Sequence, residues 1–444
     1  MDVFKLHKPD ISGSKNTLFE KLKPGTDLSS FMEKTNRPEY LFWNKVRYLP
    51  RPKGLTAEEF WALVKFFRKF SHGRVKTPIR DEQGIPFSWQ SIPGLEYLLH
   101  EVDMGLGGLI ESDVVDNQLE RRKFIARGIL EEAIASSQLE GANTTRKAAK
   151  QMIREKRKPV NKSEHMIINN YEAMIRIEEQ LRNEELNMAT LLDLHGTLTR
   201  NTIDSGDIGR LRRDSDEVVV WDTARSVIYH VPPSEKFLKN EIFRFLDYAN
   251  DDSGNSRFIH PLIKSILLHF WIGFLHPFTD GNGRLARVIF YWYLLRKQYW
   301  GFSYLPLSRI IKRSPARYRD AYVYSEQDDN DLTYFIDYNI RKIDQAKREF
   351  ESYVKKKQSE NRKIAITARS RYKLNDRQIQ LLRYLHNNPE ATTTIHTHSN
   401  INAISRVTAR KDLEDLEQEG FLTSQKVGKE RPFGATEKTH ELFS

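Results

Sequence analysis

The sequence contains no cysteine among its 444 residues. This absence excludes disulfides, thiolate nucleophiles and cysteine-ligated zinc, so any metal must be held by oxygen or imidazole ligands. The sequence also lacks any run of roughly 18 apolar residues, and its start, MDVFKLHKPDISGSKN, lacks the apolar stretch of a secretory signal. We therefore expect a soluble, cytoplasmic protein with no membrane partner.

Acidic residues are outnumbered by basic ones, and the formal net charge is +11. Most of the excess lies in two segments, residues 146–161 and 341–371. A solvated basic helix face explains such segments at least as well as contact with phosphate groups does. The net charge therefore does not by itself indicate a nucleic-acid partner.

A mainly α-helical chain is predicted, because from Glu111 onward apolar residues recur at intervals of three and four. Residues 217–221 and 226–231 depart from this pattern and are expected to form two short strands of a hairpin. In the N-terminal part, Glu58–Phe70 has the pattern of an amphipathic helix. The predicted divisions are a helical N-terminal region at 1–105, a helical core domain at 106–345, a basic helical linker at 346–373 and a final domain at 374–444.

Residues 276–287 read HPFTDGNGRLAR and carry most of the recognisable chemistry. Gly281 and Gly283 allow the backbone around Asn282 to turn its N–H groups inward as an anion-binding nest. The helix that is expected to begin at about Asn282 adds its positive N-terminal end. This segment therefore predicts a phosphate site.

Four side chains of the same segment suit nucleotide chemistry. Arg284 and Arg287 lie three apart on one helix face, so both can reach the outer phosphates of a triphosphate. Asp280 is the only carboxylate in the loop and suits a Mg²⁺ ion that arrives with the nucleotide. His276, with an unperturbed pKa of about 6.5, can accept a proton from an attacking hydroxyl. The alternative, a helix cap, a glycine turn and surface ion pairs, explains each residue singly but not their combination.

The segment resembles the complete signature of the Fic family, His-x-Phe-x-Asp/Glu-Gly-Asn-Gly-Arg-x-x-Arg. The resemblance implies a helical fold and a protein adenylyltransferase, which transfers AMP from ATP to a Ser, Thr or Tyr hydroxyl of a protein and releases pyrophosphate. It also implies a role for each residue: His276 as general base, Asp280 as Mg²⁺ ligand, Gly281, Asn282 and Gly283 as anion hole, and Arg284 and Arg287 as binders of the β- and γ-phosphates.

Other segments resemble the same family, which brings the resemblance to about residues 106–345. Gly209–Arg212 is similar to the Gly-x-x-Arg stretch that precedes the family's β-hairpin flap, and the predicted hairpin lies where the flap should be. The resemblance implies that the flap covers the nucleotide and aligns a target segment by β-strand addition. The flap residues so implicated are Val227, Ile228, Tyr229 and His230. Residues 318–336 resemble the helix pair that closes the adenosine pocket.

A helix is predicted near residues 128–141, ahead of this core, and its end carries a pattern that bears on inhibition. Ser136 and Glu140 lie four apart on one helix face, and Gly141 is a natural C-terminal stop. The pattern resembles the inhibitory Ser/Thr-x-x-x-Glu-Gly/Asn motif of Fic proteins, which implies that Glu140 pairs with Arg287 and occupies the space of the γ-phosphate. We therefore expect low basal transfer. In some relatives the same Glu positions water to remove AMP, which is the alternative role.

The last domain resembles a winged helix-turn-helix, with helices predicted at 376–387, 395–400 and 405–419. Arg406, Arg410 and Lys411 lie in the N-terminal half of the third helix, the end that would contact DNA. The wing would carry Lys426, Lys429 and Arg431. Because basic and acidic residues nearly balance in this domain, a role in protein contact or in homodimerisation is the alternative.

Two functions of different class remain open. The chain is either a regulated adenylyltransferase, whose winged helix contributes localisation or target choice, or a DNA-binding transcriptional regulator, whose Fic domain senses a nucleotide. An intact His276 favours the enzyme, because a sensor needs the arginines and the nest but no base. The protein substrate and the hydroxyl that is modified follow from no pattern in the sequence.

Overall fold

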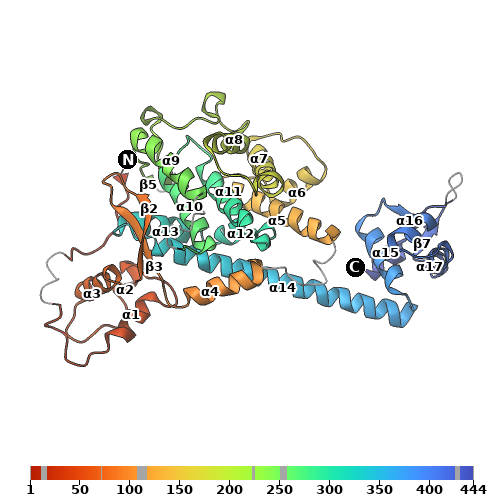
Figure 1. Cartoon of the computed structure of the whole chain (residues 1–444), viewed down its shortest axis with the longest axis horizontal. Helices are drawn as coiled ribbons and strands as arrows, with labels where there is room; N and C mark the ends of the chain where they lie inside the picture. Colours follow the sequence, from red (N-terminus) through yellow and green to blue (C-terminus); the bar gives the residue numbers. More distant parts are fainter. Residues whose placement is uncertain are drawn as a thin grey trace. The chain divides into compact units, whose positions relative to one another are not determined.

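The computed structural model describes residues 2–11, 18–71, 73–107, 118–222, 226–250, 258–425 and 431–443 (Figure 1). The chain divides into two compact units, Met1–Phe350 and Glu351–Ser444. The long helix α14, Thr333–Tyr372, begins in the first unit and ends in the second. None of the helices in these described ranges is long and apolar enough to cross a membrane.

The first unit is mainly helical, as the sequence predicts. Besides the start of α14, its helices are α1 Leu28–Asn36, α2 Trp43–Val46, α3 Ala57–Lys69, α4 Leu95–Val102, α5 Gln118–Leu139, α6 Arg146–Arg154, α7 Lys162–Arg176, α8 Met188–Thr199, α9 Glu235–Asn250, α10 Pro261–Leu275, α11 Asn282–Arg296, α12 Leu307–Ile311 and α13 Pro315–Gln327. Its strands are β1 Asp2–Val3, β2 Arg74–Arg80, β3 Pro86–Gln90, β4 Val220–Asp222 and β5 Val227–His230. Helix α3 covers the predicted amphipathic segment and begins with a capping box between Thr56 and Glu59.

Helices α10 and α11 lie at the centre of the first unit and pack against each other. Pro261 occupies the first turn of α10, where a missing N–H costs nothing, and the His260 ring accepts a hydrogen bond from the Leu262 amide at 3.1 Å. Nearly every residue of both helices is buried. Because both helices are enclosed and closely packed, the short loop that joins them is held between fixed ends.

The N-terminal region contains strands that the sequence analysis does not anticipate. Strands β2 and β3 form an antiparallel hairpin, in which Thr77 and Ile79 point inward. Phe87 of β3 packs against Phe270 and Phe274 of α10, with ring centroids 5.3 and 5.1 Å apart. The sequence analysis expects a helical region at 1–105, and these two strands depart from that expectation because the buried contacts of Phe87 come from a distant helix.

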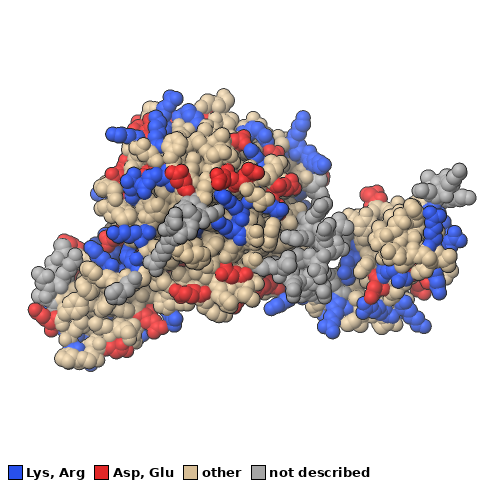
Figure 2. All heavy atoms as spheres, viewed as in Figure 1, with Lys and Arg blue, Asp and Glu red and all other residues tan. Residues whose placement is uncertain are grey.

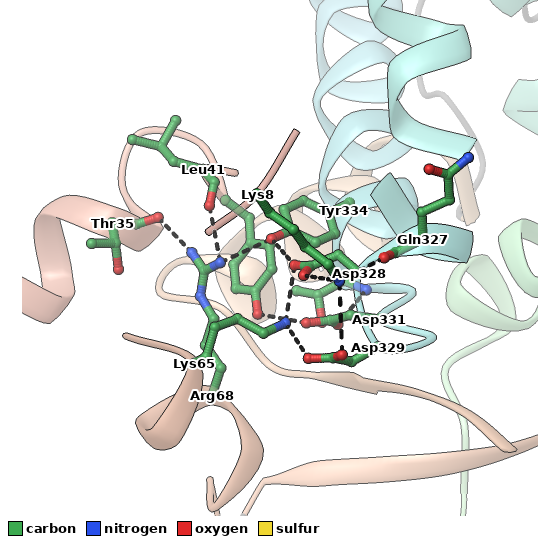
Figure 3. A network of polar contacts seen from close by, with 12 residues as sticks. Lys8, Thr35, Leu41, Lys65, Arg68, Gln327, Asp328, Asp329, Asp331 and Tyr334 are labelled. Carbon is green, nitrogen blue, oxygen red and sulfur yellow. Dashed lines mark hydrogen bonds and ion pairs between the residues drawn. The ribbon is translucent and has the colours of Figure 1, made fainter. Parts of the chain in front are cut away.

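A buried polar network joins this region to the start of α14 (Figure 3). The Arg68 guanidinium donates to the Leu41 carbonyl at 2.9 Å and to the Tyr334 hydroxyl at 3.1 Å. Lys65 forms an ion pair with Asp328 at 3.0 Å. Such enclosed, hydrogen-bonded charges fix the relative position of the elements that carry them, so residues 28–69 are part of the same unit as the central helices.

In the second unit α14 is followed by further helices and a small sheet: α15 Asp376–Asn387, β6 Thr392–Thr393, α16 Ile395–Asn402, α17 Arg406–Gln418, β7 Leu422–Ser424, β8 Phe433–Ala435 and α18 Glu437–Leu442. The sheet has the order β6-β8-β7 and is antiparallel. The three predicted helices are present within about two residues of their expected ends. The identification of this unit as a winged helix-turn-helix stays a prediction, and Lys426 and Lys429 lie outside the described residues.

Candidate active site

The loop between α10 and α11 is closed on itself. The Asn282 side chain donates to the Phe278 carbonyl at 2.8 Å and accepts from the Phe278 amide at 2.9 Å. Phe278 is fully buried, as expected of an anchor. Gly281 has φ +83°, and a Cβ there would lie 2.8 Å from the Thr199 methyl group, so only glycine fits this turn.

His276 ends α10 in the left-handed conformation, with φ 45° and ψ 58°. Its Nδ1 lies 3.3 Å from the Gly273 carbonyl, which favours a proton on Nδ1 and leaves Nε2 with a lone pair. Burial and the neighbouring His230 lower the pKa of His276 to about 3. The imidazole is therefore neutral at pH 7 and able to accept a proton through Nε2.

Arg212 fastens the backbone on either side of this histidine. Its Nε donates to the His276 carbonyl at 2.8 Å, its Nη2 donates to the Leu275 carbonyl at 3.2 Å, and its amide donates to the Pro277 carbonyl at 2.9 Å. These carbonyls end α10 and have no acceptor role within the helix. Arg212 therefore holds the backbone around His276 in position.

Two arginines of α11 form a buried cradle with spare donors. Arg284 is fully buried and donates to the Leu198 carbonyl at 2.6 Å, and Arg287 is 3% exposed. Among the described residues, no acceptor lies within hydrogen-bond distance of the buried Nε and Nη2 of Arg284 or the Nη1 of Arg287, although Asp280 Oδ1 lies 3.8 Å from Arg284 Nη2. Buried guanidinium N–H groups rarely stay unsatisfied, so these donors indicate an anionic ligand. The first N–H groups of α11 also lack partners within their helix, as at any helix start.

Glu140 lies directly across this cradle. Its Oε1 accepts a hydrogen bond from Arg287 Nη2 at 2.8 Å, the pair that the family resemblance implies. A Cβ built on Gly283 would lie 2.2 Å from the same oxygen, so the carboxylate touches the backbone at the start of α11. Burial opposes the charge of Arg287, yet Glu140 outweighs it and raises the pKa of the guanidinium above its ordinary value. A carboxylate thus already occupies part of the predicted phosphate site.

Helix α5 is fixed where it carries Glu140. Ser136 accepts from Arg287 twice, through Oγ at 2.8 Å and through its carbonyl at 3.0 Å. The buried Glu132 carboxylate accepts from the Ser308 amide at 2.8 Å and from the Tyr291 hydroxyl at 2.9 Å. After Leu139 the chain turns through Gly141, with φ +92°. These contacts hold Glu140 at the end of a braced helix.

Asp280 lies at the open side of the loop. Its side chain is 42% exposed, and its Oδ1 accepts from the Gly281 amide at 2.6 Å. Its Oδ2 lies 3.9 Å from the ammonium group of Lys162 at the start of α7. Within the described ranges, no three His, Asp or Glu side chains form a ready-made metal site. A metal bound here would therefore depend on oxygen atoms supplied by its ligand.

Comparison with known proteins identifies the domain. Residues 185–294, which span α8 to most of α11 and include this loop, match the Fic/DOC family. The chain carries a Fic domain.

Three relatives match the Fic domain over part of their length. They are protein adenylyltransferase Fic of Nematostella vectensis, 36% identical over 90 residues (20% of this chain, 18% of the relative), protein adenylyltransferase Fic of Drosophila grimshawi, 32% over 115 residues (26% and 21%), and protein adenylyltransferase fic-1 of Caenorhabditis elegans, 28% over 107 residues (24% and 19%). The chain thus matches about a fifth of the length of these curated relatives. A solved Fic family protein from Desulfovibrio desulfuricans G20 has the same fold, with a TM-score of 0.50 and 20% identity over 78% of this chain and 96% of that one.

The hairpin that is predicted at the place of the family's flap is present. Strands β4 and β5 pair antiparallel, as the sequence predicts, and β5 consists of Val227, Ile228, Tyr229 and His230. His230 closes the flap onto α10, because its Nε2 lies 2.8 Å from the Phe274 carbonyl and its Nδ1 lies 2.7 Å from Glu326. Burial disfavours the charged ring, but Glu326 outweighs it and raises the pKa of His230. The role of these residues in nucleotide binding stays a prediction.

His195 of α8 is a site residue that the sequence analysis missed. Its ring stacks on Phe278 with centroids 3.7 Å apart, and its Nε2 lies 3.0 Å from the Asp280 carbonyl. Its Nδ1 accepts from the Gly209 amide at 3.0 Å. Burial lowers the pKa of His195 to about 4, so a neutral ring joins the loop to the Gly209–Arg212 stretch. A lone histidine on an apolar helix face gives no local signal of this role.

Helix α13 supplies two tyrosines near the cradle. The Tyr318 hydroxyl lies 2.7 Å from Nε2 of the buried His269, and a Cβ on Gly273 would lie 2.5 Å from the Tyr322 hydroxyl. Both tyrosines therefore pack closely on α10. Their predicted part in an adenosine pocket, like that of residues 318–336 as a whole, stays a prediction.

In the second unit the three predicted DNA-contacting residues share one surface. Arg406, Arg410 and Lys411 are exposed on α17, as is Val407 between them at 80%. Lys and Arg side chains are more prominent than Asp and Glu on the face of this unit drawn in Figure 2. Arg431 is used locally, because it pairs with Glu417 at 2.6 Å.

Proposed function

We propose that the Fic domain transfers AMP from ATP to a Ser, Thr or Tyr hydroxyl of a protein. The proposal rests on two features that occur together: a neutral His276 imidazole with a lone pair on Nε2, and two buried arginines on the next helix that have N–H groups without hydrogen-bond partners. A structural helix junction needs neither. The relatives named above, which are called protein adenylyltransferases, support the same reaction class.

In the proposed reaction the acceptor hydroxyl oxygen attacks the α-phosphorus of ATP. One P–O bond forms, the bond from the α-phosphorus to the bridging oxygen of the β-phosphate breaks, and pyrophosphate leaves. His276 takes the hydroxyl proton on Nε2. Arg284, Arg287 and the first N–H groups of α11 stabilise the negative charge that moves onto the β- and γ-phosphates.

The residues present fit a Mg²⁺ ion bound together with ATP. Proteins commonly hold Mg²⁺ through one or two carboxylates, with phosphate oxygens and water completing the shell. Asp280 is one half-exposed carboxylate beside the start of α11. When bound, the ion would neutralise phosphate charge. Asp280 would orient it.

Glu140 is proposed to restrain this reaction. Arg287 can satisfy either the Glu140 carboxylate or a terminal phosphate, and the carboxylate that touches Gly283 occupies space a phosphate needs. AMP transfer should therefore be slow while Glu140 is in place and faster once Glu140 is displaced. The same carboxylate could instead position water for removal of AMP from a modified protein, and the assay below measures that reaction too.

Full-length protein with Mg²⁺ and ATP labelled at the α-phosphate tests the proposal. We expect little self-labelling of the unmodified chain, strong labelling of Glu140→Gly, and none of Glu140→Gly combined with His276→Ala. ATP labelled at the γ-phosphate serves as the control for kinase activity and should leave no label. Label that persists after His276→Ala would contradict the role of His276, and the nucleotide-sensor function predicts no label in any variant. Release of AMP from labelled Glu140→Gly protein on addition of unmodified chain would show the reverse reaction.

We also propose that the second unit contacts DNA through α17, on the observation that Arg406, Val407, Arg410 and Lys411 are all exposed on one helix start. Arg410→Ala and Lys411→Ala together should weaken binding of the full chain to duplex DNA and reduce the steepness of its salt dependence. The exposed Lys355→Ala on α14 serves as the control. Unchanged DNA binding in the double variant, or a concentration-dependent dimer that it abolishes, would favour protein contact instead.

A further inference from the structure

The flap is not an open hairpin, because a third strand lies on it. Strand β1 pairs parallel with β5, with Asp2 opposite Val227 and Val3 opposite Ile228. The Phe4 amide then donates to the Ile228 carbonyl at 2.7 Å. The sheet order β1-β5-β4 makes β5 a central strand, and Figure 1 shows the N-terminus of the chain beside it. The chain thus covers the outer edge of its own flap.

Beyond β1 the backbone of the same segment is held by a side chain. The carboxamide of Gln327, at the end of α13, donates through Nε2 to the Phe4 carbonyl at 2.9 Å. Its Oε1 accepts from the Leu6 amide at 2.8 Å. One carboxamide therefore binds an amide and a carbonyl of extended chain, as a neighbouring strand would. Because these hydrogen bonds are made to backbone atoms, they do not depend on the side chains of the bound segment.

Side chains of the segment alternate as in a strand. Phe4 and Leu6 are partly buried, and the Phe4 ring lies 5.1 Å from that of Tyr229. Lys8 donates to the Gln327 carbonyl at 2.8 Å and pairs with Asp328 at 3.5 Å (Figure 3). The intervening side chains, among them Lys5, are exposed. Specificity therefore resides at every second position.

This edge leads to the proposed base. His230 ends β5, and its ring centroid lies 6.3 Å from that of His276. Because β1 runs parallel to β5, a segment on this edge extends in the direction of His230. An extended polypeptide bound here is thus carried toward the imidazole that would accept a hydroxyl proton.

The resemblance to Fic proteins places an extended target segment on the edge of the flap, here the outer edge of β5. We propose that residues 2–8 occupy this edge together with Gln327, a surface here called the docking track, as a built-in competitor of that segment. The segment that fits has bulky apolar side chains at two alternate positions, as Phe4 and Leu6, and a basic side chain two residues later, as Lys8. The partner's identity as a substrate rests on the proposed adenylyl transfer. The binding of an extended segment does not.

Peptide binding tests the docking track without any transfer. The probe is a fluorescent peptide, DVFKLHKPD, with the sequence of residues 2–10. It is titrated into the full chain and into the chain lacking residues 2–8, both carrying His276→Ala. We expect binding to the truncated chain to be at least about tenfold tighter, because the tethered segment no longer competes. In the truncated chain, Gln327→Ala should weaken binding by about tenfold, since two backbone hydrogen bonds are lost.

Two peptides of equal charge form the matched control. Lys8→Glu in the peptide places a carboxylate near Asp328 and should abolish binding, whereas Lys5→Glu, at an exposed position, should leave most of it. If truncation perturbs folding, as judged by the thermal melt, the full chain with Phe4→Ser and Leu6→Ser provides a second way to release the segment. Equal binding to full and truncated chains, no binding to either released form, or equal loss from both lysine changes would overturn the inference. Peptide binding without AMP transfer by the active chain would uphold the docking track and contradict the proposed function.

Discussion

Replacing Glu140 by glycine should make the protein less stable and better at binding ATP. The pair between Glu140 and Arg287 is short, at 2.8 Å, with Arg287 buried and the Glu140 side chain 28% exposed. Hydrogen bonds to charged groups contribute about 1.5–3 kcal/mol. Arg287 keeps both bonds to Ser136 in the variant, so we expect a loss of this size in the free energy of unfolding. The larger loss of about 3–5 kcal/mol that follows complete isolation of a buried charge does not apply.

In the variant, ATP no longer has to break the pair between Glu140 and Arg287 in order to bind Arg287. Because each 1.4 kcal/mol corresponds to about tenfold in affinity, Glu140→Gly should bind ATP on the order of 10- to 100-fold more tightly. Isothermal titration with ATP and Mg²⁺, in a His276→Ala background that prevents turnover, measures the affinity. Urea denaturation with and without ATP measures stability, and ATP should stabilise the variant more than the parent at equal concentration.

Glu131→Gln is the matched control. Glu131 lies on the same helix and pairs with Arg146 and Lys150, away from Arg287. Its substitution should lower stability with no gain in ATP affinity. A Glu140→Gly protein that is as stable as its parent, or that binds ATP no better, would refute the competition between carboxylate and phosphate.

Three further outcomes are expected. Burial lowers the pKa values of His269 and His276 to about 3, so protonation of the unfolded chain below its ordinary histidine pKa of about 6.5 should lower the free energy of unfolding as the pH falls. Urea midpoints measured between pH 7.5 and 5 would show this fall, which should be shallower in His269→Gln. Arg212→Lys, which loses the forked contact with the loop carbonyls, should lower kcat by about ten- to a hundredfold with ATP affinity unchanged, and a weakened affinity instead would place Arg212 in the phosphate site. His195→Phe keeps the stacking but loses the contact with the Asp280 carbonyl, so we expect reduced labelling at limiting Mg²⁺ that excess Mg²⁺ restores; equal loss at every Mg²⁺ concentration would argue against this role.

Local pattern predicted much of this molecule. Loop 276–281 and the start of α11 follow from glycine spacing, and the helices of the second unit follow from capping residues and apolar periodicity. The β2–β3 hairpin did not follow, because its inward residues are few and its aromatic partner is on a distant helix. A two-residue strand such as β1 has no detectable period at all.

The sequence by itself determined which chemical groups are present: an imidazole, a single carboxylate, two glycines and two arginines, at spacings that allow them to meet at the start of one helix. Packing decided how that chemistry is arranged. Only the tertiary structure showed that His195 and Arg212 brace the loop, that Glu140 rests on Gly283, and that residues 2–8 lie along β5. These contacts join parts of the chain far apart in sequence, and they form because burial of the α10–α11 core brings those parts together, which no local periodicity records.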